Sequence, residues 1–259
     1  MSNLQAQIFN VGLFAGIPAC DTEPTIQAVR ALVQGGIYGI ILPWHKHVFE
    51  ALEQVHTEFP ALLIGVQGPW AQTSQTLDKG ASFAVSNTPV YTAEAVYFRR
   101  EGNALICPIT QKVLAECSNK IVFVEDIQKE DWARITRRAY AAVNEMLGFE
   151  LRHVGINNPN EAAADGVAGQ FEQFFRFRKE DKGGAFFAGT FIESMKKPFY
   201  GTHGHIAIAT TNPARAVWYL EKRGAAFNWD SAGYNEDGTL RVVYLQDEIG
   251  GFAVHIVQK

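Results

Sequence analysis

The sequence predicts an α/β protein in two parts, a parallel sheet covered by helices and then an α+β domain of two βαβββ repeats. Short apolar runs alternate with segments of helical periodicity over residues 12–147. That alternation changes after Gly148. The segment His-Val-Gly-Ile-Asn at 153–157 is then echoed by His-Ile-Ala-Ile-Ala at 205–209, which indicates an internal repeat. We therefore expect domains at 1–148 and 149–259.

The first part shows six apolar runs, each followed by a helical pattern. Apolar strands that alternate with helices are typical of a parallel sheet with both faces covered. An open sheet of about six strands would leave two exposed edges, and proteins normally cover such edges. We therefore expect a homo-oligomer, or cover from the second domain. The strands are expected at 12–19, 38–44, 61–67, 82–87, 103–109 and 120–126, and the helices at 22–36, 46–59, 70–80, 90–102, 111–117 and 130–147.

The second part reads as two units of the same order. Each begins with a strand and a helix and continues with further strands. The first unit is expected at 151–157, 161–177, 184–190 and 191–197, and the second at 205–211, 213–225, 226–231, 241–247 and 251–259.

Composition limits the classes of partner. The chain has a formal net charge of −4, which gives no broad basic surface for a nucleic acid. No stretch approaches the length of about 18 apolar residues that a membrane helix requires, and the N-terminus has no signal-peptide pattern. The 3 cysteines have no CxxC spacing, which favours a reducing compartment. We expect a cytoplasmic protein.

Four side chains at matching strand positions of the two repeats are candidate metal ligands. His153 and His205 lie on the first strands, and Glu193 and His255 lie on the last strands. Side chains two residues apart share a face of a strand, so both histidines face small neighbours. Three imidazoles and a carboxylate suit zinc, or iron, manganese or nickel where positions stay open to water.

Simpler interpretations stand beside the metal site. A histidine on a strand is often only a hydrogen-bonded sheet residue. His203 lies two residues before His205, on the same face, and is a competing ligand. The repeat is also compatible with a fold that carries no metal.

The segments "MLGFELRHVGIN", "GTHGHIAIATTN" and "DEIGGFAVHIVQK" resemble the vicinal oxygen chelate (glyoxalase-like) superfamily, in particular the domain fused behind some aldolases. The resemblance covers the whole second domain. It implies a metal held by one residue from the first and last strand of each unit, as at His153, Glu193 and His205. The sequence departs from the pattern at His255, where the superfamily often has Glu.

The first domain resembles the 2-keto-3-deoxy-6-phosphogluconate/4-hydroxy-2-oxoglutarate aldolase family, through "GIPACDTEPTIQAVRALVQGGIYGI", "FPALLIGVQGPWAQTSQTLDKGASFAVSNT" and "ICPIT". The resemblance implies a (β/α) barrel, here truncated, in which a lysine forms a Schiff base with pyruvate and a glutamate transfers protons. Ile41 takes the place of that glutamate, and His45 stands near the expected arginine. Lys120 in "KIVFVE" is the candidate lysine.

Trp44, His45 and His47 follow the second expected strand, where parallel-sheet enzymes bind ligands. They are the candidates for binding a small carboxylate or a phosphorylated keto acid. Three functions remain open. The first is an aldolase-family protein that has largely lost its aldol-cleavage residues and carries a metal-binding glyoxalase-like domain. The second is an active enzyme, either a metal-dependent lyase or isomerase of the oxygen-chelate type or a weak aldolase using Lys120. The third is a non-catalytic assembly or binding protein.

Overall fold

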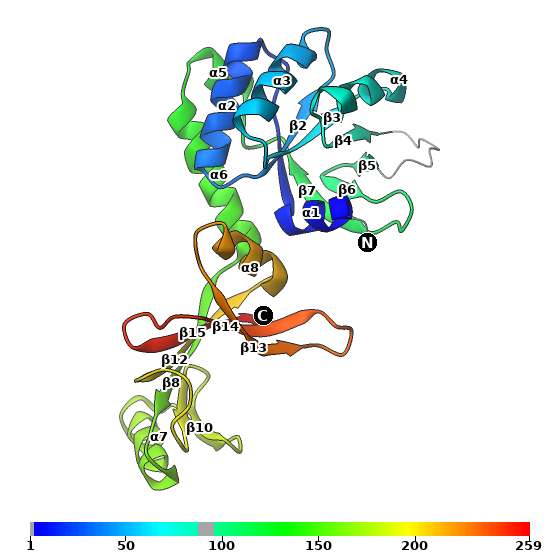
Figure 1. The fold of residues 1–259 in the computed structure, drawn as a ribbon. Helices are drawn as coiled ribbons and strands as arrows, with labels where there is room; N and C mark the ends of the chain where they lie inside the picture. Colours follow the sequence, from blue (N-terminus) through cyan, green and yellow to red (C-terminus); the bar gives the residue numbers. More distant parts are fainter. Residues whose placement is uncertain (1–2, 88–95) are drawn as a thin grey trace. The chain divides into compact units, whose positions relative to one another are not determined.

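The computed structural model describes residues 3–87 and 96–259. The chain forms two compact units, Met1–Met146 and Leu147–Lys259, which are described separately here (Figure 1). Within the described residues, no helix is both long enough and apolar enough to cross a lipid bilayer.

The first unit is a closed barrel of seven strands in the order β1 to β7. Neighbouring strands from β1 to β5 pair in parallel, β6 is antiparallel to both of its neighbours, and β7 pairs in parallel with β1. The strands are β1 Leu13–Gly16, β2 Gly39–Pro43, β3 Leu63–Gln67, β4 Phe83–Ser86, β5 Tyr97–Glu101, β6 Ala104–Ile106 and β7 Val113–Ser118.

The expected open sheet of six strands is therefore wrong, as is the expectation that a partner or the second domain covers its edges. A short hairpin completes the barrel: Glu101 pairs with Ala104 across a loop of Gly102 and Asn103. Gly102 has φ +57°, a left-handed conformation that glycine adopts without strain. The pairing of β7 with β1 closes the ring of described strands, and the expected homo-oligomer stays a prediction.

Three expected elements around this closure are corrected. Residues 90–95 of the helix expected at 90–102 lie outside the described residues, and Tyr97–Glu101 form β5. The helix expected at 111–117 is strand β7, because Cys117 lies opposite Phe14 of β1 and both are buried inside the barrel. The strand expected at 120–126 is replaced by helix α5, Val124–Gln128.

Helices surround the barrel, with α2, α3 and α6 grouped on its outer side in Figure 1. Gly35 at the end of α2 lies against α6, where an added Cβ would come within 2.4 Å of the Ala139 methyl carbon. Such close packing requires a glycine. The remaining helices are α1 Asn3–Val11, α2 Thr22–Gln34, α3 Val48–Glu58, α4 Trp70–Thr73 with the 3₁₀ turn Ser74–Lys79, and α6 Trp132–Leu147.

Aromatic rings fill the barrel interior. The Phe83 ring packs edge-on against Phe14 and Phe98, at centroid distances of 5.5 and 5.3 Å. Gly39 and Gly65 make room for them, because an added Cβ would lie within 2.6 Å of the Phe14 or Phe83 ring. Large side chains alternating with glycines thus produce a packed core and no open channel.

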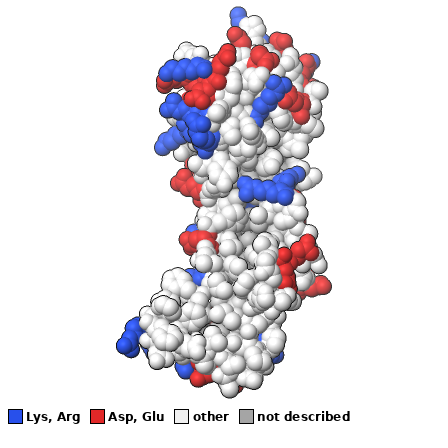
Figure 2. Space-filling view, turned by 90° about the vertical axis from the view of Figure 1, so that its left-hand side faces the viewer, with Lys and Arg blue, Asp and Glu red and all other residues white. Residues whose placement is uncertain are grey.

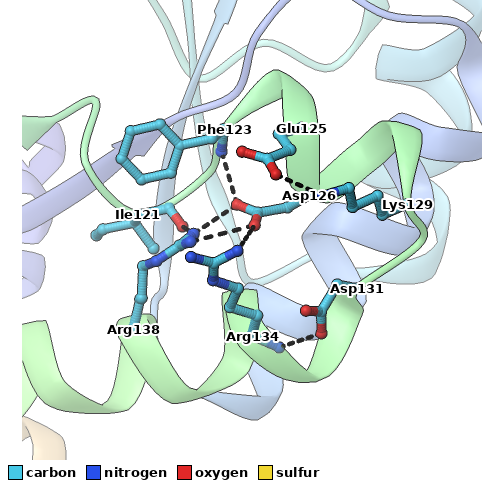
Figure 3. Close-up of polar contacts among 8 residues, drawn as sticks. All are labelled: Ile121, Phe123, Glu125, Asp126, Lys129, Asp131, Arg134 and Arg138. Carbon is cyan, nitrogen blue, oxygen red and sulfur yellow. Dashed lines mark hydrogen bonds and ion pairs between the residues drawn. The ribbon is translucent and has the colours of Figure 1, made fainter.

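A buried carboxylate links α5 to α6 (Figure 3). Asp126 is 1% exposed; its Oδ2 accepts the Phe123 backbone N–H, and its carboxylate pairs with the Arg138 guanidinium. Arg134 lies on the same side, 3.7 Å from Asp126 Oδ1. The hydrogen bonds from Arg138 outweigh the effect of burial and lower the pKa of Asp126. This carboxylate fixes the start of α5, in the segment expected to be a strand.

The second unit is an eight-stranded sheet in the order β13-β14-β15-β12-β8-β11-β10-β9. In each half the first strand pairs in parallel with the last one, β8 with β11 and β12 with β15, and a helix follows the first strand. The two first strands meet antiparallel at the centre. The elements are β8 Glu150–Asn157, α7 Glu161–Phe175, β9 Lys179–Asp181, β10 Ala185–Ala188, β11 Ile192–Met195, β12 Gly204–Thr210, α8 Pro213–Glu221, β13 Phe227–Tyr234, β14 Leu240–Leu245 and β15 Phe252–Gln258.

Surface charges of both signs are intermixed on the face drawn in Figure 2. The surface carries exposed ion pairs such as Arg30–Glu58 and Lys79–Glu53. Pairs of this kind contribute little to stability, because water and salt screen them.

The buried Asp126 pair gives a stability prediction. Asp126→Asn leaves the Arg138 guanidinium without its carboxylate, and we expect the free energy of unfolding to fall by about 2–3 kcal/mol. Because folding depresses this pKa, the stabilisation is present above the unfolded pKa of aspartate and disappears as the pH falls through the folded value. Urea unfolding at several pH values measures both effects.

Glu125→Gln is the matched control, since it removes the exposed neighbouring carboxylate that pairs with Lys129. It should leave stability unchanged. Equal stability of Asp126→Asn and the wild type at neutral pH would show that the pair does not hold α5 in place.

Candidate metal centre

Two neighbouring rows of residues on one sheet face carry the candidate ligands of the second unit. In one row, Glu193 of β11 and His205 of β12 lie on either side of Gly155 of β8. In the other row, His153 of β8 and His255 of β15 lie on either side of Ala207 of β12. The rows are two residues apart along β8 and β12, so all four side chains share one face.

Three of the four side chains meet at nearly a single point. His153 Nε2 and His205 Nε2 are 3.1 Å apart, and each lies 3.0 Å from Glu193 Oε2. Ligand atoms about 2.1 Å from a metal ion and at right angles to one another are separated by about 3.0 Å. The spacing is that of neighbouring ligands in an octahedral shell and is shorter than the about 3.4 Å between ligands of a tetrahedral ion.

Hydrogen bonds can bridge only two of these three short contacts at once. Each imidazole Nε2 carries at most one hydrogen, and an ionised carboxylate carries none, so at most two hydrogens serve the three short contacts. A cation at the centre of the triangle would accept a lone pair from all three atoms at once. The donor set of His153, Glu193 and His205 therefore fits a metal ion better than a hydrogen-bonded cluster.

His255 brings a third imidazole to the same place. The nitrogens that the three histidines offer lie within 4.8 Å of one another. Among the described residues, both ring nitrogens of His255 and Nδ1 of His205 are buried without a hydrogen-bond partner. An unsatisfied buried polar atom costs about 1–3 kcal/mol, so these nitrogens indicate a ligand that completes them.

Burial and neighbouring charges set the protonation of two of the ligands. Burial would raise the pKa of Glu193, but hydrogen bonds with His153 and His205 overcome it and lower the pKa to about 2. Burial, and then the nearby His205 and His153, lower the pKa of His255 to about 3. Glu193 is thus an anion and His255 a neutral imidazole near neutral pH, the forms in which both groups bind metals.

Local backbone features make room for the cluster. A Cβ at Gly155 would lie 2.0 Å from His205 Cε1, so only glycine allows the His205 ring to lie where it does. Next to His153 the register shifts, because Leu151 pairs with Ile208 and His153 with Ala207, which leaves Arg152 as an extra residue. Bulges of this kind redirect side chains and are common beside active sites.

Aromatic rings surround the ligands. The Tyr244 ring stacks on His255 at a centroid distance of 4.6 Å and an angle of 26°. Phe187 packs edge-on against His153, and Phe199 against His205. Burial, followed by the charge of Glu193, raises the pKa of Tyr244, which keeps its phenol neutral. These walls restrict how far the imidazoles rotate.

His203, the competing candidate, is not part of the cluster. Its side chain is exposed and its ring lies beside Phe252. His203 follows Gly201 and Thr202 in the loop before β12. The rule that side chains two residues apart share a face therefore does not apply to it. Side chains alternate between two faces only within a strand.

The candidates of the first unit do not converge on one site. The barrel mouth holds a cavity of about 480 Å³ at the carboxyl ends of the strands, and Trp44, His45, His47 and Lys120 are not among its lining residues. Lys120 follows β7 and is exposed at a different cavity, between β7 and α6. Ile41, which stands where the aldolase resemblance implies glutamate, does line the mouth and is apolar.

The side chain that sequence reasoning missed is Arg100. It lines the mouth cavity and is 9% exposed. We interpreted residues 97–102 as part of a helix. They contain strand β5, in which Phe98 and Arg100, two residues apart, are both buried.

No family profile and no curated protein matches the chain. Solved structures do match. The KDPG aldolase from Legionella pneumophila, described with pyruvate captured as a covalent carbinolamine intermediate, has 17% identity, a TM-score of 0.47 and alignment over 54% of this chain and 98% of that one. The 2-keto-3-deoxy-6-phospho-gluconate aldolase from Zymomonas mobilis has 16% identity and a TM-score of 0.40, over 54% and 96% of the two chains.

The matched structures also include a methylmalonyl-CoA epimerase, at 14% identity and a TM-score of 0.30, covering 42% of this chain and 93% of that chain. Likenesses at these identities and TM-scores decide nothing about activity, which depends on the site itself.

Proposed function

We propose that the second unit binds a divalent metal ion through His153, Glu193, His205 and His255, and that it is a metal-dependent isomerase or lyase for a small substrate. One observation carries the proposal. Three candidate ligand atoms lie 3.0–3.1 Å from one another, with at most two hydrogens for three short contacts, beside buried imidazole nitrogens that have no partner among the described residues.

The donor set narrows the choice of ion. Imidazole with one carboxylate suits zinc, and it also suits iron, manganese or nickel where coordination positions remain open. One carboxylate leaves a dication with a net positive charge. That charge favours a substrate with an anionic or strongly polar oxygen.

When bound, such an ion supplies polarisation of a carbonyl or enolate oxygen. The surrounding residues determine how a substrate approaches. The side chains of His153 and Glu193 are 16% and 19% exposed, whereas that of His205 is 4% exposed. A substrate therefore reaches the centre from the side of His153 and Glu193, while Tyr244 and Phe199 limit the water around it.

The barrel unit is proposed to be an aldolase-like scaffold without aldol-cleavage turnover. Schiff-base chemistry requires a desolvated lysine facing the substrate, together with a group that transfers protons. The residues of 3–87 and 96–259 that line the mouth include no lysine, and Ile41 stands where the resemblance implies glutamate. The position of Lys120 gives the weak-aldolase alternative no support.

Metal content is the first test. Wild-type protein purified with each candidate metal should hold about one ion per chain by elemental analysis after dialysis. His205→Ala and His255→Ala should each lose most of it, because loss of one ligand from a four-ligand site strongly weakens binding. His203→Ala is the matched control, since its exposed ring is two residues from His205 and outside the cluster. Equal metal content in all four proteins would refute the site.

Gly155→Ala tests the geometry without removing a ligand. The new Cβ forces the His205 ring to move, so we expect metal affinity to fall and the free energy of unfolding to decrease by about 1–3 kcal/mol. Gly166→Ala in α7, where a Cβ meets no atom within 4 Å, should instead gain about 0.5–1 kcal/mol and keep the metal. Titration with a chelating dye measures affinity, and urea unfolding measures stability.

Proton exchange tests the chemistry. The metal-loaded protein should exchange the hydrogen next to the carbonyl of a hydroxyketone such as acetoin for solvent deuterium, as followed by NMR. His153→Ala and chelator-treated protein should not catalyse this exchange, whereas His203→Ala should. Metal binding without exchange of any hydroxyketone or diketo acid would support the non-catalytic alternative.

A further inference from the structure

The segment that joins the two halves of the second unit lies against the sheet face that carries the candidate ligands. Residues 196–203 connect β11 to β12 and form neither helix nor strand. We call this segment the strap. Asn157 of β8 contacts it from the same face as His153 and Gly155, because side chains two residues apart on a strand share a face. The strap therefore passes beside the candidate metal centre.

One amide side chain holds the strap at its middle. Asn157 Oδ1 accepts the Phe199 backbone N–H at 3.1 Å, and Asn157 Nδ2 donates to the carbonyl oxygens of Phe199 at 3.1 Å and of Gly201 at 2.8 Å. The Asn157 backbone N–H also donates to the His203 carbonyl oxygen, at 3.2 Å. An asparagine amide has two hydrogens to donate, and both are used on the strap. Aspartate would lack these two donors, and alanine would lack all three side-chain bonds.

A second clamp holds the end of the strap. Glu248, in the loop before β15, accepts the Thr202 backbone N–H at 3.0 Å and the Thr202 hydroxyl at 2.9 Å. The turn into β12 requires glycine, because Gly201 has φ +84° and a Cβ there would overlap the Gly204 carbonyl oxygen. Thr202 and Glu248 are both exposed, so this clamp is removable without disturbing the core.

The strap carries two aromatic rings to the candidate ligands. The centroid of the Phe199 ring lies 6.4 Å from that of His205. The centroid of the Tyr200 ring lies 4.8 Å from that of Tyr244, which stacks on His255. Phe199 and Tyr200 are themselves 48% and 41% exposed, and segments with few buried apolar contacts open at a low cost in free energy. The bonds to the strap, more than burial, therefore keep these rings beside the ligands.

We propose that the strap gates the metal centre and that Asn157 is the positioning residue that keeps the gate closed. The gating role rests on the metal centre proposed above, whereas the bonds between Asn157 and the strap do not. When the strap opens, the His205 side of the cluster becomes accessible to water and to chelators, and the ion leaves by that route. Because opening precedes both entry and loss of the ion, the gate changes both rates by the same factor and leaves the affinity nearly unchanged.

Amide hydrogen exchange of the metal-free full chain, followed by NMR, tests the Asn157 bonds by themselves. In Asn157→Ala the exchange of the Phe199 amide should be about ten- to a hundredfold faster, because three neutral hydrogen bonds to the strap are lost. Asn157→Asp keeps the acceptor but not the donors, and should exchange at an intermediate rate. Asn235→Ala is the matched control, since it removes an asparagine amide that bonds Thr239 and Gln258 instead. It should exchange Phe199 like the wild type.

Release of zinc to an excess of chelator measures the gate in the metal-loaded full chain. Asn157→Ala should lose the ion about ten- to a hundredfold faster than the wild type, with nearly the same equilibrium affinity. Glu248→Ala releases the other end of the strap and should lose the ion several times faster, which also serves if the first variant fails to fold. Asn235→Ala should match the wild type in both rate and affinity.

Different failures are distinguishable. Unchanged Phe199 exchange in a folded Asn157→Ala protein would overturn the role of Asn157. Wild-type rates of zinc loss in both Asn157→Ala and Glu248→Ala would overturn the gate. An affinity that falls by the same factor as the dissociation rate rises would also overturn it, because that result indicates displaced ligands. Absence of zinc from the wild type would instead refute the metal centre, and the gate with it.

Discussion

The short contacts among His153, His205 and Glu193 are the constraint on which the second unit depends. Buried polar groups must be paired, and these three atoms, 3.0–3.1 Å apart, share at most two hydrogens among three short contacts. The eight-stranded sheet brings them together because the two first strands meet at its centre and each last strand lies beside a first one. Gly155 then leaves the space that the His205 ring occupies. A bound cation accounts for all of these features together.

The first unit is held together by closure of its barrel and by an aromatic core. Its barrel closes with only seven strands, because one antiparallel strand replaces longer βα connections. Aromatic rings fill the lower interior, and the mouth above them keeps a cavity with one buried guanidinium. Among the described residues that line this cavity there is no lysine and no glutamate, which supports our proposal of a barrel without aldol-cleavage turnover.

Repeat matching and the alternation of side chains along a strand predicted that His153, Glu193, His205 and His255 share one sheet face, while their role as metal ligands stays a prediction. The same reasoning misplaced His203, which lies in a loop, and it gave no sign of the bulge at Arg152. In the barrel, the segment at 97–102 was interpreted as helical although a Gly-Asn pair marks a two-residue hairpin. Arg100 was missed for that reason. Lys120 was placed on a strand, whereas the capping bonds of Asp126 fix a helix at 124–128.

X-ray absorption spectroscopy at the edge of the bound metal examines the central claim most directly. The account predicts a first shell at about 2.0–2.2 Å containing nitrogen and oxygen, with the outer-shell scattering of the three imidazoles His153, His205 and His255. In His255→Ala, one imidazole contribution should disappear while the shell distance stays the same. A spectrum with oxygen ligands alone, or one that is identical in His255→Ala, would contradict the account.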